Sequence, residues 1–168
     1  PGEWRLEDGW ISSCYGERRP APVCTFTAHG TGAQEFYSFL LPRTNGSSRV
    51  SVRELAARGG RAFELRDAGT CDQLLAGGGT LIETQRLASD FKWAWARFEV
   101  ETGLLSELVL IDGRRLMLDG LEILNEAEPV AYVTARRVDD RLSVVINDRI
   151  RFHPGFMINE PGTLSLEV

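Results

Sequence analysis

The sequence predicts an all-β protein, an antiparallel two-layer β-sandwich built from hairpins and a C-terminal meander. Two observations lead to this prediction. Short runs rich in β-branched and aromatic residues end at Gly, Pro or Asp, which is typical of strands joined by tight turns. The chain also contains no long helical pattern and no solenoid repeat. Because its 168 residues suit one domain, we expect a single sandwich over residues 1–168.

The meander is expected to run from about Phe91 to Ile146 and depends on four turns. Asp112-Gly113 and Asp119-Gly120 separate short apolar runs, and Asp-Gly accepts the positive φ angles that two-residue hairpins need. Further turns are expected at Thr102-Gly103 and Asp139-Asp140. Together these signals predict consecutive antiparallel strands.

The first half of the chain also favours strands. Residues 22–30 (PVCTFTAHG) and 35–42 (EFYSFLLP) combine β-branched and aromatic residues with a closing Gly or Pro. Residues 50–60 could form a short helix, but their start alternates like a strand. The Gly run in residues 74–83 (LLAGGGTLIE) predicts a loop or hairpin tip, since it lacks the Lys-Ser/Thr ending of a phosphate-binding loop.

Two of these segments are apolar on both faces. Residues 35–42 and 90–100 place apolar side chains at both odd and even positions, with Trp93 and Trp95 on one face and Ala94 and Phe98 on the other. A strand buried on one side only should alternate apolar and polar residues. We therefore expect protein that this chain does not contain to cover the second face.

Composition excludes some classes of function. A formal net charge of −5 argues against nucleic acid as a partner, because phosphate binding needs concentrated Lys and Arg. No apolar run approaches the roughly 20 residues of a membrane-spanning helix. The first residues lack a signal-peptide layout and read as a cut end of a longer protein.

Cysteine and histidine give no metal-binding pattern. Cys14, Cys24 and Cys71 form no CxxC pair, and His29 and His153 stand in unrelated contexts. A zinc site needs about four clustered ligands, so we expect no metal and no cofactor. The cysteines are interpreted as small buried hydrophobes and the histidines as loop residues.

Several segments resemble the C-terminal β-sandwich of heparinase II/III-like proteins, a family of bacterial heparin, heparan sulfate and related alginate lyases. The resemblance starts with DGWISSCYGERRPAPVCTFTAHG and EFYSFLLPR, and continues in SDFKWAWARFE and LSELVLIDGRRLMLDG. Its elements include Asp8-Gly9-Trp10, Tyr15-Gly16, residues 20–23 (PAPV) and residues 40–42 (LLP). These elements are structural, and none is a catalytic signature.

The resemblance implies a larger protein. In such proteins a helical toroid precedes the sandwich, and the acidic polysaccharide lies in the cleft between them. Asn, His and Tyr groups, mostly from the toroid, carry out the β-elimination. The chain resembles the region C-terminal to those motifs, so it would be a C-terminal fragment without catalytic residues. The resemblance also implies a periplasmic or secreted protein.

Four residues are candidates for contacting a substrate. Trp93 and Trp95, two apart on a strand, share a face and could stack on sugar rings; packing in a core is the alternative. Arg18 could grip a sugar carboxylate, or lie in a solvated turn. Tyr15 could donate a proton, but a buried ring bonded to backbone is favoured, and Trp10 is expected in the core.

These observations suggest three functions. The leading one is the structural, cleft-supporting sandwich of a polysaccharide lyase. The second is a carbohydrate-binding module that uses Trp93 and Trp95. The third is an interaction domain whose apolar face docks another chain or a second copy of itself, giving a homo-oligomer.

Overall fold

The computed structural model describes residues 2–41, 49–138 and 141–146, and these residues form strands and loops without a helix. All strand pairs are antiparallel, which confirms the predicted all-β class. The chain divides into two compact units, residues 1–42 and residues 43–168. We describe each unit by itself, and the expectation of one sandwich domain stays a prediction.

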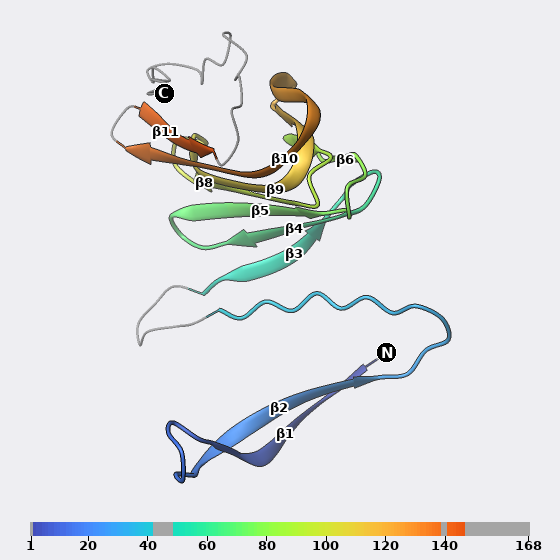
Figure 1. The fold of residues 1–168 in the computed structure, drawn as a ribbon, viewed down its shortest axis with the longest axis vertical. Helices are drawn as coiled ribbons and strands as arrows, with labels where there is room; N and C mark the ends of the chain where they lie inside the picture. Colours follow the sequence, from blue (N-terminus) through green and yellow to red (C-terminus); the bar gives the residue numbers. More distant parts are fainter. Residues whose placement is uncertain (1, 42–48, 139–140, 147–168) are drawn as a thin grey trace. The chain divides into compact units, whose positions relative to one another are not determined.

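The first unit contains a hairpin of β1 (Gly2–Ile11) and β2 (Arg19–Ala28) (Figure 1). The register pairs Trp4 with Phe26, and their ring centroids lie 4.8 Å apart. Trp10 shares the face of Trp4, because both are even-numbered positions of one strand. Trp10 is 62% exposed, so the prediction that it packs in a core is wrong. A two-stranded hairpin has no second layer to bury that face.

Residues 35–41 do not form the strand that their composition predicts. They follow β2 as irregular chain (Figure 1). Aromatic and β-branched residues favour a strand only where a neighbouring strand supplies ladder hydrogen bonds and packing, and no strand pairs with this stretch among the described residues.

The second unit is one curled antiparallel sheet, here called the main sheet, which bends into a half-barrel (Figure 1). Its strands run in the order β11-β10-β9-β8-β5-β4-β3, and the short β6 and β7 join through β9. The strands from β8 to β11 therefore form the predicted meander. The strand bounds are β3 Ser51–Leu55, β4 Arg61–Arg66, β5 Thr70–Ala76, β6 Ile82–Glu83, β7 Leu87–Ser89, β8 Trp93–Glu99, β9 Leu105–Leu118, β10 Leu121–Val138 and β11 Arg141–Ile146.

Three of the predicted turns lie where the sequence places them. Asp119 and Gly120 join β9 to β10 with φ angles of 48° and 81°, the positive values that a two-residue hairpin requires. Thr102-Gly103 turns between β8 and β9, and the Gly run at residues 77–79 turns after β5. The predicted turn at Asp139-Asp140 lies outside the described residues.

Asp112-Gly113 is not a turn, contrary to the prediction. β9 continues through both residues, and Asp112 has a φ of 53°. The carboxylate of Asp90 accepts the backbone N–H groups of Arg114 at 2.8 Å and Arg115 at 2.7 Å. The positive φ therefore produces a bend inside one long strand, because a neighbouring loop satisfies the backbone groups that a hairpin would have paired.

The bend lets the main sheet pack against itself. Before the bend β9 pairs with β8, and after it β9 pairs with β7. We call the concave face of the main sheet, which bears Leu75, Ala94 and Leu110, the inner face, and the opposite face the outer face. The core joins inner-face residues to residues of β6, β7, the segment before β8 and the parts of β9 and β10 beyond the bend: Ala62, Leu75, Ala94, Ala96, Phe98, Leu108, Leu110, Val133, Ile82, Leu87, Phe91, Leu116, Leu118, Ile123 and Leu124.

Gly113 allows the close contact at the bend. A methyl group in its place would lie within 2.7 Å of the Phe91 backbone nitrogen, so Gly113→Ala forces backbone to move. We expect this substitution to lower the free energy of unfolding by about 1–3 kcal/mol, measured by urea denaturation. Gly69→Ala is the matched control, since its added methyl meets only Asp67 Oδ1 at 4.0 Å. Equal stability of the two variants would contradict the role of the bend.

Candidate functional site

Trp93 and Trp95 lie on the outer face of the main sheet, as the spacing of two residues predicts. Their neighbours Ala94, Ala96 and Phe98 are buried on the inner face. Trp93 is 47% exposed, and Trp95 is half-buried. The strand is therefore apolar on both faces, and its outer face is only partly covered.

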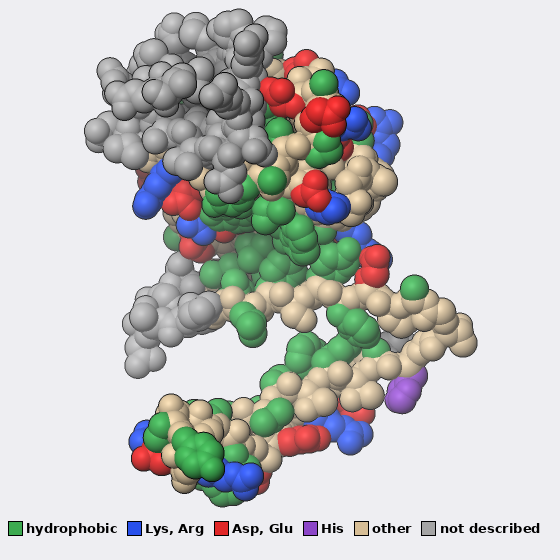
Figure 2. Space-filling model, in the orientation of Figure 1, with side chains coloured by type: hydrophobic (Ala, Val, Ile, Leu, Met, Phe, Trp, Pro, Cys, Tyr) green, Lys and Arg blue, Asp and Glu red, His purple; other side chains and the backbone are tan. Residues whose placement is uncertain are grey.

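Apolar residues of the adjoining strands extend this outer surface. Trp93 pairs with Ile111, which is 41% exposed, and Trp95 pairs with Val109. On the other side Trp95 pairs with Leu74 of β5. Paired residues share a face, so these side chains form one apolar surface across β5, β8 and β9. Figure 2 shows hydrophobic side chains gathered along the main sheet around β4 and β5.

A row of charged residues borders the apolar surface. Arg97 donates two hydrogen bonds to Asp72, from Nε to Oδ1 at 2.7 Å and from Nη2 to Oδ2 at 2.8 Å. The hydrogen bonds to Asp72 raise the pKa of Arg97. The Arg97 guanidinium also lies 5.1 Å from the centroid of the Trp95 ring, and Glu107 lies 3.6 Å from its Nη1. The guanidinium lies over the Trp95 ring, which is a cation–π contact.

Tyr15 and Arg18 belong to the other unit. Both lie exposed in the turn that joins β1 to β2. Arg19, the first residue of β2, forms an ion pair with Glu17, with 3.5 Å between Nη2 and Oε2. The prediction of a buried Tyr15 ring is therefore wrong, because the tip of a hairpin has nothing opposite it. The four candidate residues are thus divided between the two units, with Trp93 and Trp95 in the main sheet.

The cysteines are less buried than predicted. Cys14 and Cys24 are exposed and Cys71 is half-buried, and all three are free thiols. His29 follows β2 as an exposed loop residue, as expected, whereas His153 lies outside the described residues. Within the part of the chain that the structure describes, no cluster of His, Cys, Asp and Glu could hold a metal ion.

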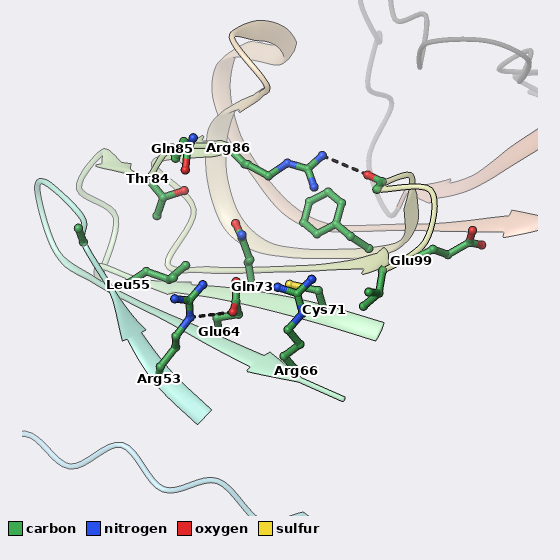
Figure 3. A pocket seen from close by; sticks show the side chains of 14 residues that line it. Arg53, Leu55, Glu64, Arg66, Cys71, Gln73, Thr84, Gln85, Arg86 and Glu99 are labelled. Atoms are coloured by element: carbon green, nitrogen blue, oxygen red, sulfur yellow. Dashed lines mark hydrogen bonds and ion pairs between the residues drawn. The ribbon is translucent and has the colours of Figure 1, made fainter. Parts of the chain in front are cut away.

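The inner face holds a cavity that was not predicted from the sequence. It has a volume of about 420 Å³ and lies over β3, β4 and β5, beneath the loop between β6 and β7 (Figure 3). Cavities of this size suit a small molecule. Its polar lining consists of Arg53, Glu64, Arg66, Cys71, Gln73, Thr84, Gln85, Arg86 and Glu99.

Glu64 is the buried acid of this cavity, only 5% exposed. Arg53 Nε donates to its Oε1 at 2.8 Å, and this hydrogen bond lowers the pKa of Glu64 although burial opposes the shift. A buried carboxylate needs such a partner to stay ionised. Arg53 therefore keeps Glu64 ionised at the polar end of the inner face.

Arg86 closes the opposite side of the cavity. It donates to Asp119 from Nε at 2.9 Å and from Nη2 at 2.7 Å, and also to the Gly103 carbonyl at 3.2 Å. Its guanidinium stacks 4.0 Å from the centroid of the Phe98 ring. Bidentate pairing with Asp119 raises the pKa of Arg86 and holds this side chain in place at the side of the cavity.

Cys71 stands on the floor of the cavity, beside Arg66 in the register of β4 and β5. Burial and then the hydrogen bond to Glu64 raise the pKa of the Cys71 thiol. The thiol is therefore protonated near neutral pH and is a poor nucleophile.

A sequence signal for this cavity does exist. Arg53, Glu64 and Gln73 are directly paired across β3, β4 and β5, and their parity puts them on the same face as Leu75 and Ala94. Three polar residues at core-facing positions of successive strands indicate a lined cavity. This pattern can be recognised only once the strand register is known.

The Arg53–Glu64 pair predicts a pH dependence. Its depressed pKa means that Glu64 contributes stability above its ordinary value of 4.5, and this contribution is lost as the pH falls through the folded-state value. The loss of stability caused by Arg53→Gln should therefore shrink between about pH 5 and pH 3, measured by urea unfolding. Asp67 also has a lowered pKa but is present in both proteins. Arg61→Gln, which breaks an exposed pair with Glu54, is the control and should cost little at any pH. A cost of Arg53→Gln that stays constant over this range would contradict the prediction.

Comparison with known proteins gives no relative for this fold or site. No family model, no curated protein and no solved structure matches the chain. Among the described residues no helix is long and apolar enough to span a membrane. The functional argument therefore rests on the residues and on the geometry given above.

Proposed function

We propose that the chain is the β-sheet part of a heparinase II/III-like polysaccharide lyase, where it supports the substrate cleft and supplies no catalytic group. The observation that carries this proposal is the partly exposed apolar surface on the outer face, with Trp93 and Ile111 at its centre. Contiguous exposed apolar surface marks a place where other protein packs. The quoted sequence resemblance suggests what that protein is, an upstream helical domain.

The polar groups of the main sheet support a structural role. Arg97 is held by Asp72, and Arg86 is held by Asp119. Among its described residues the main-sheet unit contains no histidine. An acid–base pair for β-elimination needs a group within hydrogen-bond reach of the substrate proton. In this proposal such groups come from the rest of the protein.

The proposal predicts a difference between the chain alone and the longer natural polypeptide. The chain alone should release no unsaturated uronate from heparin, heparan sulfate or alginate, whereas the longer polypeptide should do so, measured by ultraviolet absorbance. Turnover by the chain alone would show that the catalytic groups lie within it and would refute the proposal.

The outer face gives a second readout of the same proposal. Trp93→Lys should reduce self-association of the chain alone in size-exclusion chromatography, because it charges the exposed apolar surface. The same substitution should destabilise the longer polypeptide, where other protein covers Trp93. Arg58→Lys, an exposed position in the loop after β3, is the control and should change neither property.

Direct carbohydrate binding by the outer face is the second candidate function. The observation in its favour is that Trp93 and Trp95 share the outer face of the sheet, while Arg97 lies over the Trp95 ring. A sugar ring could lie over such indoles with its C–H groups against the aromatic faces. Trp93, which is 47% exposed, is the more accessible ring for that contact.

Glycan titration tests this candidate. In a Trp4→Phe, Trp10→Phe background the remaining tryptophans, Trp93 and Trp95, should change fluorescence as heparin or alginate oligosaccharides bind. Trp93→Ala should weaken binding at least about tenfold, a change of about 1.4 kcal/mol. Val52→Ala, at an exposed position of β3, is the control. Unchanged affinity in Trp93→Ala would eliminate the sugar platform.

A further inference from the structure

The cavity on the inner face contains a buried acceptor that the protein leaves unsatisfied. Gln73 is only 7% exposed and lines the cavity, and its Oε1 has no hydrogen-bond donor among the described residues. In Figure 3 its side chain rises from β5 toward Thr84 and Gln85. A buried amide oxygen without a donor is unfavourable, so a ligand that donates a hydrogen bond there removes that penalty.

The cavity also contains one cation without an ion pair. Arg53 is neutralised by Glu64, and Arg86 is neutralised by Asp119. Arg66 also lines the cavity and makes no ion pair with any described residue. Arg66 is therefore the cation of this lining that a ligand carboxylate could pair with.

The remaining lining agrees with a small anion. In Figure 3 the Arg66 guanidinium rises beside Cys71 into the cavity, whereas the Glu99 carboxylate points away from Gln73. Thr102 Oγ1 donates to that carboxylate at 2.9 Å. Leu55 adds apolar surface to the wall. The cavity volume of about 420 Å³ accommodates a ligand of monosaccharide size.

We propose that this cavity binds a hydroxylated monocarboxylate of about monosaccharide size. The carboxylate pairs with the Arg66 guanidinium, whose two N–H donors match carboxylate geometry. A ligand hydroxyl donates to Gln73 Oε1. A simple carboxylate offers no donor to Gln73, and a neutral polyol offers no charge to Arg66, so both features are required together.

Three ligands with the same six-carbon chain separate these requirements. Gluconate has the carboxylate and the hydroxyls, hexanoate has only the carboxylate, and sorbitol has only the hydroxyls. In titrations of the ¹⁵N-labelled chain, gluconate should shift the backbone amide signals of residues 64–73 saturably. Hexanoate and sorbitol should bind at least about tenfold more weakly. Absence of saturable shifts with gluconate, or equal binding of hexanoate, overturns the proposal.

Substitutions then assign the two contacts. Arg66→Gln and Gln73→Leu should each weaken gluconate binding at least about tenfold, with unchanged amide spectra elsewhere. Arg66 is exposed, so its substitution leaves the fold intact even if Gln73→Leu does not fold. Arg61→Gln, an exposed β4 position outside the cavity lining, should bind as the unchanged chain does. Wild-type affinity in Arg66→Gln refutes the proposal.

Cys71 provides an independent readout, because its thiol lines the same cavity. In a Cys14→Ser, Cys24→Ser background, gluconate should slow alkylation of Cys71 by iodoacetamide, and sorbitol should not. Unchanged alkylation at saturating gluconate overturns the proposal. Trp93→Ala should leave all of these results unchanged, since Trp93 lies on the outer face. The test of the cavity proposal is therefore independent of the proposed function.

Discussion

The contact between Asp90 and the bend in β9 determines how the main sheet folds. Asp90 Oδ1 accepts two successive backbone N–H groups, from Arg114 and Arg115, and its own backbone N–H donates to the Arg115 carbonyl at 3.3 Å. These bonds hold Asp112 at a φ of 53° inside a continuous strand. A straight β9 would leave Leu116 and the residues after it without the inner-face partners that bury them. One carboxylate therefore enables one sheet to form both layers of its own core.

The same bend explains why the two faces of the sheet differ. Residues beyond the bend cover the β8 and β9 part of the inner face, where Ala94 and Leu110 are fully buried. They do not extend over β3, β4 and the adjoining part of β5, where the row of inner-face residues continues as Gln73, Glu64 and Arg53. Polar groups are tolerated there because the edge of the cover leaves a cavity. On the outer face of the described residues, Trp93 and Ile111 stay partly exposed.

Local sequence patterns predicted much of this fold, and the predictions that were wrong have a common cause. Asp119-Gly120 and Asp112-Gly113 have the same sequence, and in both pairs the Asp adopts positive φ. Only the first pair is a hairpin, because its flanking strands pair with each other. At the second pair a distant residue, Asp90, satisfies the backbone. Positive φ is thus a local property that sequence reveals, whereas reversal of the chain depends on partners that sequence does not name.

The two candidate sites differ in the same way: one depends on local sequence and the other on distant partners. Trp93 and Trp95 could be placed on one face from their spacing alone, because parity within a strand is a local property. The cavity brings together Arg53, Gln73 and Arg86, which come from three separate segments, so its existence depends on register and on the bend. A polar residue at a core-facing position is informative only when the face is known. The unsatisfied Oε1 of Gln73 is for this reason a stronger indication of a ligand than any exposed aromatic residue. A buried acceptor without a hydrogen-bond donor destabilises the fold, and no local structural requirement explains this one.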